Sequence, residues 1–104
     1  MNENCKLVGR LATAVRENDL DAVHELLSQG ADPNWPDIFS GYTPLHSAAV
    51  NGNLEIVKAL VGAGANINHS TNVVGEIPLA QATEAGRTAV INYLKSLSVG
   101  KQDD

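Results

Sequence analysis

The sequence is poor in cysteine and has no long apolar run. Cys5 is the only cysteine, so no disulfide can form within the chain. No stretch approaches the roughly 20 apolar residues that a membrane-spanning helix needs. The N-terminal sequence, MNENCKLVGR, is polar and has no apolar signal core behind it. We therefore expect a cytoplasmic protein that does not insert into a membrane.

Cationic side chains are also scarce. Seven Lys and Arg stand against 12 Asp and Glu, which gives a formal net charge of −5. A nucleic-acid binder needs a cationic surface that displaces counterions, so nucleic acid is not expected as a partner. Hydrophobic residues make up 43% of the chain and charged residues 18%, a composition typical of one globular domain.

The chain also lacks the constellations that carry catalysis or bind metals. His24, His46 and His69 lie far apart in the sequence, so no pair has the i, i+4 spacing of a helical metal site. Ser47 neighbours His46, but adjacent residues of a helix point about 100° apart and cannot act on each other. We therefore expect no catalytic residues, no bound metal and no cofactor.

The sequence repeats itself at a constant interval. GADPN, which begins at Gly30, recurs as GANIN from Gly64, and the pair Pro44-Leu45 recurs at the same offset as Pro78-Leu79. A constant offset of this size indicates stacked supersecondary units. The interval divides a single domain, residues 1–99, into repeats at about 7–40, 41–74 and 75–99, followed by a flexible tail at 100–104.

Each repeat predicts two short helices. Thr43 is a suitable N-cap, and Pro44 then takes the first helical position, where its missing N–H costs nothing. Gly52 is expected to end this helix in a left-handed conformation, and Asn53 to begin the second helix. One such pair cannot bury its apolar face alone, so neighbouring pairs must stack on it.

The second repeat carries a recognisable succession of motifs. TPLHSAA begins at Thr43, GNLEIVKAL at Gly52 and GANIN at Gly64. This succession resembles the ankyrin repeat, although both linking segments, 30–41 and 64–75, are one residue longer than in the usual unit of about 33 residues. The resemblance implies an all-α solenoid of paired antiparallel helices with β-hairpin-like finger turns. It also implies that His46 is structural and bonds to its own helix cap and to the neighbouring turn.

An aromatic cluster marks the first finger. Trp35, Phe39 and Tyr42 are three of the four aromatic residues in the chain. Trp and Tyr are enriched at interface hot spots, and an apolar knob with a polar rim favours a partner site. The alternative is that Trp35 or Phe39 folds back on the neighbouring finger. The resemblance implies binding along the concave face, in an apolar-then-polar groove flanked by acidic residues. Position by position, this predicts contacts from Arg16, Glu17, Trp35, Ile38, Phe39, Tyr42, Val50, Asn51, Val73, Val74, Glu76 and Glu84.

The sequence thus predicts a non-enzymatic protein–protein interaction module. The expected form is a small standalone adaptor or inhibitor, monomeric, that binds another protein through its concave face and fingers. The alternative is self-association through the last helix, which has no fourth repeat to cover it. An enzyme or a small-ligand binder has less support, because no acid, base and nucleophile converge. The apolar residues of the last helix are Val90, Ile91, Tyr93, Leu94 and Leu97.

Overall fold

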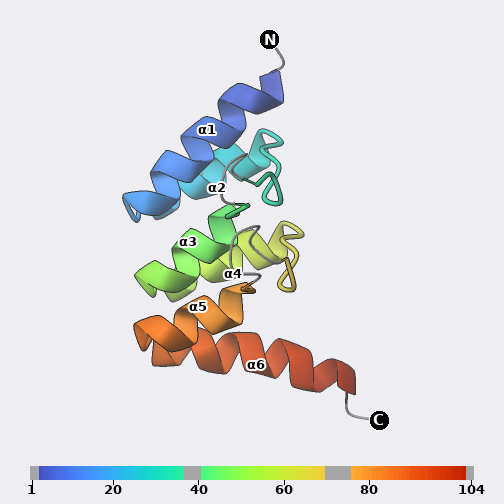
Figure 1. Ribbon diagram of the computed structural model, residues 1–104. Coiled ribbons are helices and arrows are strands. Elements are labelled where there is room, and N and C mark those ends of the chain that lie inside the picture. The colour runs from blue at the N-terminus through green and yellow to red at the C-terminus, as the bar shows by residue number, and fades with distance from the viewer. Residues whose placement is uncertain (1–2, 37–40, 70–75, 103–104) are drawn as a thin grey trace.

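The protein folds into three stacked pairs of antiparallel helices (Figure 1). The computed structural model describes residues 3–36, 41–69 and 76–102, and within these ranges it contains helices and turns but no strand. The predicted all-α solenoid is confirmed, while residues 37–40 and 70–75 of the two fingers, where β-hairpin-like turns were expected, lie outside the described residues. The pairs are α1 (Glu3–Arg16) with α2 (Leu20–Ser28), α3 (Pro44–Asn51) with α4 (Leu54–Gly62), and α5 (Pro78–Ala85) with α6 (Thr88–Gln102).

The helix ends follow the same rules in successive repeats. Asp19 and Asn53, at equivalent positions of the first two repeats, both cap the second helix of a pair. Each side chain accepts a hydrogen bond of 3.2 Å from a backbone N–H three residues on. The first helices of the second and third pairs end at Gly52 and Gly86, with φ of 79° and 72°. Asn18 takes the equivalent place in the first repeat with φ of 59°, a value that Asn tolerates better than most residues.

The core runs the length of the stack between two layers of helices. α1, α3 and α5 form the inner layer, α2, α4 and α6 the outer layer, and each helix packs on its partner and on its counterpart in the next pair (Figure 1). Ala48 and Ala49 are buried and keep α3 thin where its neighbours approach. Each fully buried leucine contributes roughly 1.5–3 kcal/mol of hydrophobic stabilisation. Such leucines occur in every repeat, at Leu11, Leu45, Leu60 and Leu94.

The bases of the two fingers repeat the same turn. The backbone N–H of Asn34 donates to Asp32 Oδ1 at 2.8 Å, and that of Asn68 donates to Asn66 Oδ1 at 2.9 Å. Asn34 also joins the fingers, because its Oδ1 accepts from the Asn66 N–H at 2.6 Å and its Nδ2 donates to the Gly64 carbonyl at 3.0 Å. The first finger is therefore fixed to the second through one amide side chain.

His46 fastens the second repeat to the third. Its ring is fully buried, Nδ1 accepts from the Thr43 N–H at 3.1 Å, and the Thr43 hydroxyl lies 2.9 Å from the same nitrogen. Nε2 donates to the Glu76 carbonyl at 2.9 Å, so the set of bonds fits a neutral ring with its proton on Nε2. Burial lowers the pKa of His46 below 6.5, against a smaller opposing effect of the Glu76 carbonyl. These bonds confirm the structural role predicted for His46.

The last helix is longer than the sequence suggested. α6 continues to Gln102 and so includes residues 100–102, which were assigned to a flexible tail. The segment contains no proline, and a single glycine costs a helix only about 1 kcal/mol, which is too little to end it. None of the helices described has both the length and the apolar character needed to cross a membrane.

Candidate functional site

A groove follows the inner helices from α1 to α5. It consists of two adjoining hollows of about 380 and 250 Å³ that share Arg16, Tyr42 and Ser47. The larger one lies between α1 and the start of α3, and the smaller one between α3 and α5. We call this surface the groove, and it is lined by Val8, Gly9, Ala12, Arg16, Trp35, Pro36, Tyr42, Thr43, Pro44, Ser47, Val50, Asn51 and Gln81.

Trp35 forms part of the wall of the larger hollow, beside Pro36. Its side chain is 37% exposed, and no other large hydrophobic residue in the described ranges is classed as exposed. The turn at the base of the first finger fixes its backbone, since the Trp35 N–H donates to the Asp32 carbonyl at 3.4 Å. An exposed indole on the wall of a hollow is the arrangement expected of a contact residue, because indole buries a large area at little cost in side-chain entropy.

Tyr42 stands where the two hollows meet, and the third repeat holds its ring in place. The phenol O–H donates to Gln81 Oε1 at 3.0 Å, and Gln81 Nε2 donates in turn to the Glu76 carboxylate. The Tyr42 ring also lies 5.3 Å from the His46 ring, centroid to centroid. Gln81 is only 7% exposed. Tyr42 is therefore half-buried and oriented, and it offers the groove an ordered ring.

Arg16 is the last residue of α1 and lines both hollows. Its guanidinium makes one long hydrogen bond, 3.5 Å to Thr13 Oγ1, and no carboxylate within the described residues pairs with it. The second arginine near the inner helix ends, Arg87, is engaged differently. Its Nε donates to the Val50 carbonyl at 2.7 Å, and its side chain lies against the open face of Gly52. Arg16 thus keeps most of its hydrogen-bonding capacity for the groove.

Five of the predicted contact residues line the groove, and the other described ones do not. Glu76 lies at its edge but is half-buried and directed to Gln81. Glu17 lines a different hollow, and Glu84 is exposed near the end of α5 outside the groove lining. Among the described residues, the lining of the groove contains no Asp or Glu, and the expected acidic flank beside the groove stays a prediction. The five are Arg16, Trp35, Tyr42, Val50 and Asn51, while Ile38, Phe39, Val73 and Val74 lie outside the described residues.

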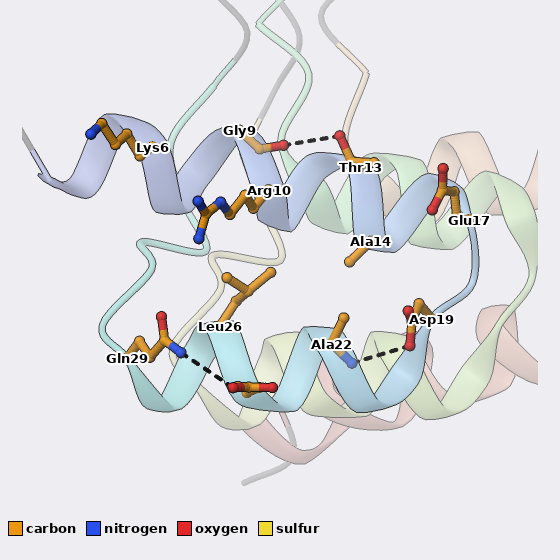
Figure 2. Close-up of a pocket in the computed structure, with 11 residues that line it drawn as sticks. Lys6, Gly9, Arg10, Thr13, Ala14, Glu17, Asp19, Ala22, Leu26 and Gln29 are labelled. Atoms are coloured by element: carbon orange, nitrogen blue, oxygen red, sulfur yellow. Dashed lines mark hydrogen bonds between the residues drawn. The ribbon is translucent and has the colours of Figure 1, made fainter.

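Figure 2 shows the hollow to which Glu17 belongs, a shallow space of about 680 Å³ between α1 and α2. Ala14, Ala22 and Leu26 form its floor, and charged side chains stand around it. Glu17 occupies the position that Asn51 has in the next repeat, and the Asn51 side chain faces backwards to donate to the Val15 carbonyl at 3.2 Å. The hollow therefore lies on the outer face of the first repeat, the face equivalent to the one by which the second repeat packs on the first.

The charges on this face agree with a solvated end of the stack. Arg10 and Glu25 stand where the second repeat has Pro44 and Ala59. Charged side chains at packing positions favour contact with water over contact with another helix pair. We therefore place the candidate site in the groove and not in this hollow.

The last helix presents little apolar surface for self-association. Val90 and Leu94 are buried, and the other three residues on which that alternative depended are half-buried and packed against the core. Lys58 Nζ lies 5.7 Å from the centre of the Tyr93 ring and covers part of it. The described part of the chain also contains no group of three or more His, Cys, Asp or Glu side chains that could hold a metal ion.

Comparison with known proteins identifies the repeat. The family model for ankyrin repeats, in three copies, matches residues 11–103. The chain belongs to the ankyrin-repeat family. Ankyrin repeats are generally protein–protein interaction modules and are typically not enzymes themselves.

The similar curated proteins are much longer than this chain. It is 41% identical over 81 residues to the tyrosine-protein kinase Shark of Drosophila melanogaster, which covers 78% of this chain and 8% of the kinase. It is 39% identical over 74 residues to the E3 ubiquitin-protein ligase KEG of Arabidopsis thaliana, and the match covers 71% of this chain and 4% of the ligase. Protein PhlB of Serratia liquefaciens is 38% identical over 77 residues, and the match covers 74% of this chain and 34% of PhlB. The kinase and ligase activities are those of the relatives.

Proposed function

We propose that this ankyrin-repeat domain is a small non-enzymatic adaptor or inhibitor that binds another protein through the groove. The observation that carries the proposal is the exposed Trp35 on the wall of a hollow that also contains Arg16 and Tyr42. Trp, Tyr and Arg are the three residue types most enriched at interface hot spots. Their convergence on one groove supports a partner site there.

Recognition depends on a surface that is already fixed before the partner arrives. Asn34 ties the first finger to the second, and the bond to Gln81 orients Tyr42. Binding to ordered side chains loses less conformational entropy than binding to mobile ones, at about 0.5–1.5 kcal/mol for each side chain that is already immobilised. The stacked helices therefore act as a rigid scaffold for the contact residues.

The proposal is tested by capturing partners from a lysate of the native source with the parent protein and a Trp35→Ala variant. Proteins are identified by mass spectrometry, and the affinity of each candidate is then measured with purified partner. We expect Trp35→Ala to weaken binding by at least about tenfold, which corresponds to about 1.4 kcal/mol.

Asn92→Ala is the control, because Asn92 is exposed on α6 in the outer layer. It should bind the partner as the parent does, and both variants should unfold thermally near the parent temperature. Equal affinity of parent and Trp35→Ala for every captured protein contradicts a binding site at this groove.

A further inference from the structure

We propose that the groove selects a partner segment that carries a single carboxylate beside an apolar side chain, with Arg16 binding the carboxylate. This inference rests on the proposed function and specifies the chemistry of the partner. It is carried by the charge of the groove, by the free hydrogen-bonding capacity of Arg16 and by the apolar residues around that side chain.

The one charged residue in the described lining of the groove has the opposite sign to the net charge of the molecule. The chain has 12 acidic residues and a formal net charge of −5, yet none of the acidic side chains that the structure describes lines the groove. Arg16 is the one charged residue in the described lining, where the remaining polar groups are hydroxyls and amides. Gln81 engages the carboxylate of Glu76 at the edge of the groove, and the field close to Arg16 favours an anionic group there.

Arg16 is exposed at the end of α1, and the protein itself uses few of its hydrogen-bond donors. A cation in the last turn interacts favourably with the helix dipole. The Val15 carbonyl, however, is already bonded by Asn51 Nδ2, and the single bond from Arg16 to Thr13 Oγ1 is long. A guanidinium has five N–H donors in a planar fork that matches a carboxylate. A partner carboxylate would supply the acceptors that the described residues do not.

The residues around Arg16 predict which type of side chain lies beside the carboxylate in the partner segment. On one side lies the hollow walled by Trp35 and Pro36, and on the other the smaller hollow with Val50. A segment that places a carboxylate on Arg16 therefore puts an adjacent side chain against an apolar wall. Burial of that side chain removes water from the ion pair and strengthens its charge-assisted hydrogen bonds.

The selected segment has one carboxylate and not a run of them. Charges on the protein surface act over about 8 Å at physiological ionic strength. Glu17 follows Arg16 directly in the sequence, and the molecule as a whole is acidic. Further acidic residues on the partner would be repelled by these surroundings, so a strongly acidic peptide should bind less well than a singly charged one.

The test is selection from a display library of random linear peptides on three purified proteins: the parent, Arg16→Gln and Arg10→Gln. Arg10→Gln is a matched control, because it makes the same substitution on the same helix. Arg10 lines the hollow between α1 and α2 and not the groove (Figure 2). We expect the parent and Arg10→Gln to enrich peptides with one Asp or Glu beside an aromatic or aliphatic residue. Arg16→Gln should lose the preference for the acid and keep the preference for the apolar residue.

Titration of one enriched peptide completes the experiment. Replacing its acid by the matching amide should weaken binding to the parent by about tenfold and leave binding to Arg16→Gln nearly unchanged. Enriched peptides without an acid, or an acid preference that Arg16→Gln retains, overturn this inference alone. A library that yields no binder, or peptides whose binding survives Trp35→Ala, contradicts the proposed function as well.

Discussion

Replacing His46 by alanine should lower the free energy of unfolding by about 3–6 kcal/mol. The Thr43 N–H loses its acceptor at a site only 3% exposed, and leaving such a donor unbonded costs about 1–3 kcal/mol. The Glu76 carbonyl also loses its donor, at about 1 kcal/mol because it is half-buried and water can replace the bond. The space left by the fully buried ring adds a cavity cost of about 1–2 kcal/mol after partial collapse.

The measurement is urea unfolding followed by far-ultraviolet circular dichroism, with His24→Ala as the matched control. His24 is exposed on α2, so its replacement should change the free energy of unfolding by no more than about 0.5 kcal/mol. A domain of this size is stable by about 5–15 kcal/mol, so the His46→Ala loss is a large fraction of the total. If the two variants unfold at the same urea concentration, the bonds of His46 do not hold the second and third repeats together.

Two further predictions concern the same network of repeat contacts. Because burial lowers the pKa of His46 below 6.5, the unfolded chain takes up a proton there at a pH where the folded chain does not. The parent should therefore lose up to about 1.4 kcal/mol per pH unit as the pH falls below 6.5 toward the folded-state pKa, and the difference in stability between parent and His46→Ala should shrink over that range. Asn34→Ala should cost about 1–2 kcal/mol, because it removes both bonds between the fingers. Asn68→Ala, at the equivalent position but without a side-chain hydrogen bond to the described residues, should cost under about 0.5 kcal/mol in the same urea titration, and equal costs would contradict the bridging role of Asn34.

The fold was predictable because its determinants lie close together in the sequence. Thr43, Pro44, Gly52 and Asn53 specify helix ends through local backbone chemistry, and the structure places all four as expected. The regular recurrence of these signals then implied stacking, since one helix pair cannot bury its own apolar face. The end of α6 was not predictable in this way, because the sequence after Leu97 has neither a strong cap nor a proline to set a boundary.

The groove was predictable only in part. Arg16 and Glu17 were assigned to the same surface, but Glu17 follows the end of α1 and lines the hollow between α1 and α2. The role of Gln81 had no signal in the sequence, because its partner Tyr42 lies 39 residues away and the second repeat has Ser47 at the equivalent position. Glu76 was expected to contact a partner, and nothing in the sequence indicated that its carboxylate accepts a hydrogen bond from Gln81.

The hydrogen bond from Tyr42 to Gln81 links occupancy of the groove to the folding of the third repeat. Among the three described pairs, α5 and α6 have a neighbouring pair on one side only, so in this chain they are expected to open locally before α3 and α4 do. A ligand that contacts the oriented Tyr42 ring binds the closed form and raises the free energy of that opening. Hydrogen exchange at α5 would then report on a ligand that touches only the first two repeats.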